Sequence, residues 1–112
     1  MNKEKLTIVC PVYNEEELIQ EFYLELRDEL QNLNEFYETR ILFIVDKSSD
    51  NTFEILCKIA EDDKKVGVIL LSKRFGHQMS LIAGIDHASD SIIIMMDSDL
   101  QHPPKIIPNL LA

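Results

Sequence analysis

Several residue types are scarce in this chain of 112 residues: tryptophan is absent, cysteine occurs twice and glycine three times. Two cysteines, Cys10 and Cys57, are too few for the disulfide framework of a small secreted domain. Each lies in an apolar run, which favours buried, reduced thiols of a cytoplasmic protein, although the sequence leaves a Cys10–Cys57 pair open. No repeat and no linker rich in proline or glycine occurs, so we expect a single domain over residues 1–112.

Basic residues are also few, and long apolar runs are absent from the sequence. The chain has 11 Lys and Arg against 20 Asp and Glu, a net charge of −9, which argues against nucleic acids and anionic membrane surfaces as ligands. No apolar run approaches the roughly 20 residues of a membrane span. The first apolar stretch is interrupted by Pro11 and Asn14, so we expect no signal peptide. An anionic ligand would need a metal ion or a local basic pocket.

What the chain does contain is an alternation of short β-branched runs with segments of helical period. Strands are predicted at residues 6–10, 41–45, 66–71 and 91–96, and helices after Asn14, after Thr52, over 77–88 and from Pro103-Pro104. Asn14 is the expected N-cap of the first helix, and the apolar residues expected on its buried face are Leu18, Phe22, Leu26, Leu30 and Leu33. This alternation predicts an α/β fold with a mostly parallel sheet flanked by helices.

Polar residues follow the predicted strands at the edge where such sheets bind ligands. Pro11, Tyr13 and Asn14 follow the first strand, and Asp46 follows the second. Lys73 and Arg74 follow the third strand; they would either balance the charge of phosphates or simply flank Phe75 at the surface. The opposite edge of the sheet is expected to carry plain turns.

Asp97 and Asp99 follow the fourth strand and are two residues apart. Alternate side chains of an extended backbone point the same way, so these two carboxylates face one small volume. Two carboxylates that close repel each other unless a cation or hydrogen-bond donors lie between them. Oxygen ligands of this kind suit Mg²⁺ or Mn²⁺. The alternative is a solvated turn that caps the next helix.

Four segments together resemble a known family. These are the segment from Cys10 to Glu16, Val45-Asp46 with Ser49 to Thr52, Arg74 to Gln78 with Ala83-Gly84, and Met96 to Pro104. In this order and spacing they resemble the family 2 inverting glycosyltransferases, most closely the dolichyl-phosphate mannosyltransferases and bacterial polyprenyl-phosphate glucosyltransferases. The resemblance runs from about Leu6 to Leu111.

The resemblance implies a GT-A fold, of which this chain would form the Rossmann-like, donor-binding N-terminal part. It also implies a UDP- or GDP-hexose donor, Mg²⁺ or Mn²⁺, a polyprenyl-phosphate acceptor, and a full-length protein at the cytoplasmic face of the membrane. Asp97, Ser98 and Asp99 would form the Asp-x-Asp element, with Asp97 and Asp99 at the metal. The remaining residues expected at the nucleotide sugar are Pro11, Tyr13, Asn14, Glu15, Asp46 and Gln101.

Two departures from the family pattern carry expectations of their own. The usual Val-Asp-Asp-Gly-Ser becomes Val45-Asp46-Lys47-Ser48, one residue shorter, which predicts weaker or altered nucleotide binding. The family's catalytic base lies well downstream of the Asp-x-Asp element, and Ala112 falls about two turns into an expected helix. We therefore expect a truncated domain, inactive by itself, whose exposed sheet edge favours self-association.

Two other functions stay open from the sequence. One is a non-catalytic nucleotide-binding or assembly module, which the shortened loop favours. The other is a phosphoacceptor regulatory domain with a parallel α/β fold. That domain would need an acidic pair after the first strand, where this chain has Pro11-Val12-Tyr13.

Overall fold

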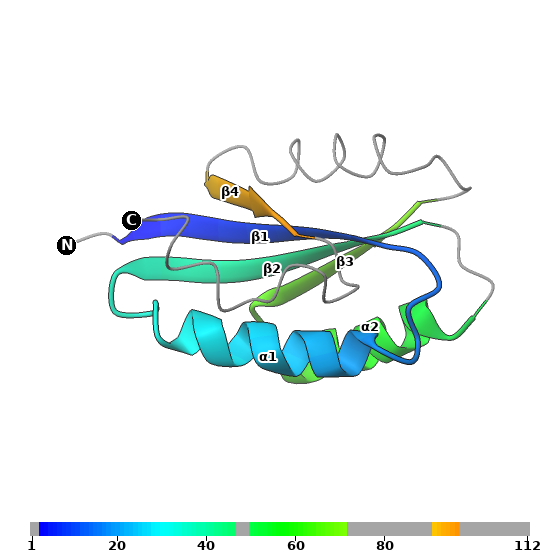
Figure 1. The fold of residues 1–112 in the computed structure, drawn as a ribbon. Helices are drawn as coiled ribbons and strands as arrows, with labels where there is room; N and C mark the ends of the chain where they lie inside the picture. The colour runs from blue at the N-terminus through cyan, green and yellow to red at the C-terminus, as the bar shows by residue number, and fades with distance from the viewer. Residues whose placement is uncertain (1–2, 47–49, 72–90, 97–112) are drawn as a thin grey trace.

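The computed structural model describes residues 3–46, 50–71 and 91–96. These residues form a parallel sheet with the strand order β3-β2-β1-β4 (Figure 1). The strands are β1 (Glu4–Val12), β2 (Tyr37–Val45), β3 (Val66–Leu70) and β4 (Ile92–Met95), and the helices are α1 (Ile19–Gln31) and α2 (Thr52–Asp62). The predicted α/β fold with a parallel sheet is confirmed.

Both faces of the sheet are apolar, which explains why its strands are continuous apolar runs rather than alternating ones. Helices α1 and α2 lie side by side on one face (Figure 1). Leu6, Ile8 and Phe43 of the strands are fully buried and form one apolar cluster with residues of α1 such as Phe22. Val9 and Ile44, which alternate with these residues along the strands, belong to a second, smaller cluster and are also fully buried.

The central pair of strands is longer than predicted. β1 and β2 pair without interruption from Glu4 opposite Tyr37 to Val12 opposite Val45. Charged residues at the amino ends conceal part of the extra length, because the apolar periodicity begins only at Leu6 and Ile41. At its carboxyl end, β1 continues through Pro11 to Val12, two residues past the predicted end at Cys10. At the carboxyl ends, the strands run to the residues where the candidate site begins.

The predicted N-cap of α1 is wrong. The helix begins at Ile19, with Leu18 as the capping residue, and Asn14 has a φ of 50°, in the left-handed region. Asparagine is one of the few residues that adopt this conformation readily, so it turns the chain sharply after β1 instead of starting the helix. As a consequence Ile19 is buried, while Leu18, predicted to be buried, is exposed.

The expectation of two buried, reduced cysteines is met in part. Cys10 is buried and Cys57 is half-buried, and neither forms a disulfide. Burial, together with the negative charges of Glu54 and Glu61, raises the pKa of the Cys57 thiol. In the part of the chain that the structure describes, no helix is long and apolar enough to cross a membrane. The helices predicted over 77–88 and from Pro103 lie outside the described residues.

Candidate functional site

The strand order creates a switch point next to β1. The chain passes from β1 outward through β2 and β3, then returns to place β4 on the other side of β1. Parallel sheets bind ligands beyond the carboxyl ends of the strands at such a reversal. The N–H of Met96 donates to the carbonyl of Val9 at 3.0 Å, so the chain leaves β4 alongside β1. The sequence then continues into Asp97, Ser98, Asp99 and Gln101, which lie outside the described residues.

Strands β1 and β2 end together, at Val12 and Val45. The N–H of Asp46 donates to the carbonyl of Val12 at 3.0 Å, and this bond brings the first residue after β2 beside the last residue of β1. Asp46 is only 4% exposed, which rules out a solvated strand end. Tyr13, the next residue along from Val12, is 38% exposed, so its ring lies at the surface of this edge.

Contrary to the prediction that it follows the first strand, Pro11 lies within β1, opposite Ile44 of β2, since β1 continues to Val12. Alternate residues of a parallel strand bond to opposite neighbours, and Val9 bonds toward β4. The backbone nitrogen of Pro11 therefore faces the β4 side of β1, as Val9 does. Pro11 lies two residues beyond the last described β1–β4 pair. At this position a missing N–H removes none of the sheet bonds that the structure describes, which explains why proline is tolerated in a central strand.

The turn after β1 is bonded to the start of α2. Thr52 accepts a hydrogen bond from the N–H of Glu15 through Oγ1 at 2.9 Å. Asp50 accepts one from the N–H of Glu16 through Oδ2 at 3.2 Å. The other carboxylate oxygen of Asp50 accepts from both the N–H and the hydroxyl of Thr52. We call this arrangement of Asp50 and Thr52 the loop tie.

The loop tie also lowers the pKa of Asp50. Burial by itself would raise the pKa of this carboxyl, but the hydrogen bonds from Thr52 and from the N–H of Glu16 outweigh that effect. They hold the pKa of Asp50 below its ordinary value, because each of these bonds favours the charged form. The sequence predicted Asp50 and Thr52 only as capping residues; their contact with the turn after β1 has no local signal in the sequence.

A cleft of about 270 Å³ lies at this turn, lined by Asn14, Glu15, Glu16, Glu17, Leu18 and Asp50. Its volume is slightly below the range of complete ligand pockets, so it suits one part of a larger ligand. Four of its six lining residues carry carboxylates, which accept hydrogen bonds and repel anions. The cleft therefore favours a group with hydroxyl or N–H donors over a phosphate.

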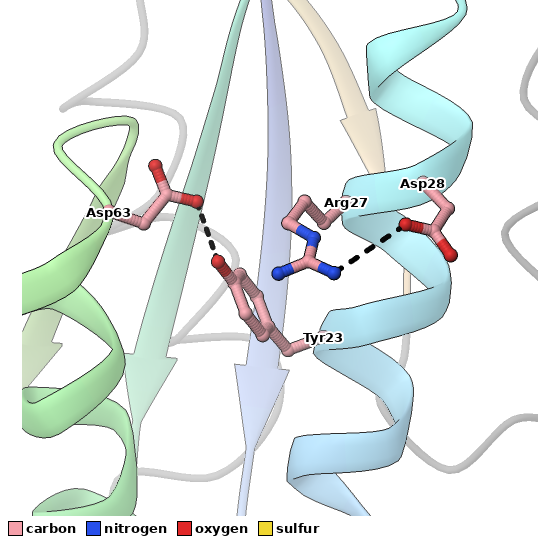
Figure 2. Close-up of polar contacts among 4 residues, drawn as sticks. All are labelled: Tyr23, Arg27, Asp28 and Asp63. Atoms are coloured by element: carbon pink, nitrogen blue, oxygen red, sulfur yellow. Dashed lines mark hydrogen bonds and ion pairs between the residues drawn. The ribbon is translucent and has the colours of Figure 1, made fainter.

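The opposite edge of the sheet is not a set of plain turns, contrary to the expectation from the sequence. Figure 2 shows the hydroxyl of Tyr23 on α1 pointing toward Asp63, to which it donates at 2.7 Å. The Arg27 guanidinium carbon lies 5.8 Å from the centre of the Tyr23 ring, and one Arg27 nitrogen lies 3.7 Å from a carboxylate oxygen of Asp28. These residues join α1 to the end of α2 and contribute to stability rather than to the candidate site.

The predicted metal ligands cannot be placed. Asp97 and Asp99 lie outside residues 3–46, 50–71 and 91–96, and within those ranges no group of three or more His, Cys, Asp or Glu residues is arranged to hold a metal ion. The residues that the structure does bring together at the switch point are Pro11, Tyr13, Asn14, Glu15 and Asp46.

Comparison with known proteins agrees with this geometry. The bactoprenol glucosyl transferase of Shigella phage SfV is 43% identical over 107 residues, which are 96% of this chain and 34% of that protein. An undecaprenyl-phosphate 4-deoxy-4-formamido-L-arabinose transferase of Salmonella choleraesuis (strain SC-B67) is 37% identical over 110 residues, 97% of this chain and 33% of that protein. The chain thus spans about a third of the length of these curated relatives.

Solved structures confirm the fold. The mannosyltransferase PcManGT from Pyrobaculum calidifontis, solved in complex with GDP-Man and Mn²⁺, superposes with a TM-score of 0.71 over 88% of this chain and 28% of that one. Its sequence identity of 22% makes this a likeness of fold, that of a GT-A glycosyltransferase. The family model described as Glycosyl transferase family 2 matches residues 7–112, nearly the whole chain. The chain belongs to glycosyl transferase family 2.

Proposed function

We propose that this chain binds the nucleoside end of a UDP- or GDP-hexose, and that the full-length protein transfers the hexose to polyprenyl phosphate. The observation that carries the proposal is the meeting of the ends of β1 and β2 at the switch point, where Asp46 lies beside Val12. The printed functions of the relatives, bactoprenol glucosyl transfer and transfer to undecaprenyl phosphate, support the acceptor. That acceptor is a membrane lipid, and we further propose, as the family resemblance implies, that the full-length protein lies at the cytoplasmic face of the membrane.

The nucleoside is the part of the donor that suits the described residues. Ribose hydroxyls and the N–H groups of a base are hydrogen-bond donors, and the cleft offers the carboxylates of Glu15, Glu16 and Glu17 as acceptors. Asp46 adds a buried carboxylate at the end of β2, and the exposed ring of Tyr13 offers a surface for stacking against a base. Pro11, Tyr13, Asn14, Glu15 and Asp46 are accordingly the residues that we assign to the nucleoside.

The diphosphate needs a different environment, because it carries negative charge and the described edge is acidic. We propose that Asp97 and Asp99 hold a Mg²⁺ or Mn²⁺ ion there, with Ser98 and Gln101 beside the donor. When bound, such an ion neutralises charge on a diphosphate leaving group. In an inverting transfer, an acceptor phosphate oxygen forms the new bond to the anomeric carbon as the bond from that carbon to the diphosphate breaks.

Two binding experiments test the proposal on this chain. We expect uridine or guanosine, which lack phosphate, to bind without added Mn²⁺, and the matching UDP or GDP to bind at least about tenfold more tightly when Mn²⁺ is present. Asp46→Asn should weaken nucleoside binding about tenfold, since it replaces one acceptor oxygen of a buried carboxyl group with an NH₂ donor. Asp28→Asn, an exposed carboxylate on α1 away from this edge, is the matched control and should change nothing. Equal nucleoside affinities for Asp46→Asn and the unchanged chain would contradict the assignment.

A second candidate function is a nucleotide-binding or assembly module without transferase activity. The shortened segment Val45-Asp46-Lys47-Ser48 favours it, because the family's second aspartate and glycine are missing there. An assembly role would include self-association through exposed apolar residues of the outer strands, such as Leu70 and Met95. Transfer of radiolabelled hexose to polyprenyl phosphate by the full-length protein would refute this second candidate.

A further inference from the structure

The turn after β1 is held by residues that lie far from it in the sequence. Glu15 bonds to the hydroxyl of Thr52 and Glu16 bonds to Asp50, separations of 37 and 34 residues. Thr52 is fully buried, and its hydroxyl both accepts from Glu15 and donates to Asp50. The loop tie is therefore a connected set of hydrogen bonds in which the Thr52 hydroxyl links the turn to the Asp50 carboxylate.

Capping of α2 does not by itself account for these bonds. The capping residue of α2 is Asn51, whose side chain makes no capping hydrogen bond, whereas Oδ1 of Asp50 accepts from the N–H of Thr52, the first residue of the helix. The second oxygen of Asp50 and the hydroxyl of Thr52 instead accept from the turn after β1. Two side-chain oxygens at the start of α2 thus accept hydrogen bonds from the backbone of Glu15 and Glu16 rather than from the helix.

The turn also needs to be held, because its conformation is uncommon. Asn14 has a φ of 50°, a left-handed conformation that costs most residues about 1–2 kcal/mol and that asparagine tolerates better than most. The bonds to Glu15 and Glu16 begin at the very next residue, so they fix the turn just after its left-handed residue. Asp50 is charged at neutral pH, as an ordinary aspartate is, and these bonds lower its pKa further; a charged acceptor makes the stronger hydrogen bond.

We infer that Asp50 and Thr52 are positioning residues of the nucleoside site, which act by holding Tyr13, Asn14 and Glu15 in the conformation that binds. This inference rests on the proposed function. A site that is formed only part of the time binds with an affinity reduced by the fraction of time that it is formed. Loss of the loop tie should therefore weaken nucleoside binding even though neither Asp50 nor Thr52 is assigned to the nucleoside.

Three variants of buried threonines test the inference. Thr52→Val removes the hydroxyl at nearly constant shape, and Thr52→Ser keeps it. Thr39→Val is the matched control: Thr39 is 1% exposed, and its hydroxyl donates to Oδ1 of Asn34 at 2.8 Å, away from the turn after β1. The readouts are the dissociation constant for uridine or guanosine by calorimetry and the hydrogen-exchange rate of the Glu15 amide by NMR.

We expect Thr52→Val to weaken nucleoside binding about tenfold and to speed exchange of the Glu15 amide about tenfold relative to amides within α2. Thr52→Ser should stay within about twofold of the unchanged chain in both readouts, and so should Thr39→Val. A general loss of stability would affect the two valine variants alike, so the control separates it from positioning.

Two results would overturn the inference, and they are distinguishable. If the unchanged chain binds nucleoside and Thr52→Val binds it equally well, the positioning role fails while the proposed function stands. If the unchanged chain binds no nucleoside or nucleotide with or without Mn²⁺, the proposed function fails, and the positioning role fails with it.

Discussion

Replacing Tyr23 by Phe tests the polar contact at the edge opposite the candidate site. The Tyr23 hydroxyl donates to Asp63 at 2.7 Å, and Tyr23 is 7% exposed (Figure 2). A net hydrogen bond to a charged group contributes about 1.5–3 kcal/mol, and water reaches the half-buried Asp63, so we expect a loss of about 1–2 kcal/mol. In a domain of this size the melting temperature should fall by roughly 4–8 °C for each kcal/mol.

The same contact makes this loss depend on pH. Burial, followed by the hydrogen bond and the negative charge of Asp63, raises the pKa of Tyr23 to about 12. Folding thus favours the neutral phenol, so the contribution is complete below the unfolded value of about 10 and disappears as the pH rises through about 12. A pKa difference of about two units corresponds to at most about 2.7 kcal/mol. The difference in unfolding free energy between the unchanged chain and Tyr23→Phe should therefore decrease by up to this amount as the pH rises.

Urea unfolding followed by far-ultraviolet circular dichroism measures both effects, since the chain has no tryptophan for fluorescence. Tyr37→Phe is the control, because within the described residues its ring packs on the core but its hydroxyl has no hydrogen-bond partner. We expect it to unfold like the unchanged chain at about pH 7 and about pH 11. If Tyr23→Phe unfolded at the same urea concentration as the unchanged chain at neutral pH, the reasoning about the Tyr23–Asp63 bond would be refuted.

Three further changes have defined outcomes. Asn14→Ala should lower the melting temperature by several degrees, because alanine pays about 1–2 kcal/mol for a left-handed conformation, whereas Asn14→Gly should lower it less. Phe22→Ala should destabilise the chain by about 3–5 kcal/mol in urea unfolding, since this side chain is fully buried between α1 and the sheet; a loss below about 1 kcal/mol would mean that the core is packed differently. Replacing Lys47 by Asp-Gly should tighten binding of UDP or GDP in calorimetry, and no gain in affinity would refute the role given to the shortened loop.

The arrangement of strands and helices was predictable because it depends on local patterns. Apolar runs such as Ile41 to Val45 predict buried parallel strands, and the polar residues after them indicate the ligand-binding edge. The start of α1 was not predictable, because Asn14 suits both a helix cap and a left-handed turn, and hydrogen bonds from distant residues decide between them. The contact between Tyr23 and Asp63 joins residues that are 40 positions apart in the sequence, and no local pattern predicts it.

The central claim is that this chain has a nucleotide site that depends on a divalent metal ion. Its most direct test is thermal unfolding of the unchanged chain with UDP, GDP, UDP-glucose or GDP-mannose, each with and without Mn²⁺. At about a hundredfold excess over its dissociation constant, a ligand adds roughly 2.7 kcal/mol, which raises the melting temperature by about 10 °C or more in a domain of this size. We expect such a rise with the nucleotides of one base when Mn²⁺ is present, and a clearly smaller rise at the same ligand concentration without it. No rise with any of the four ligands would contradict the claim.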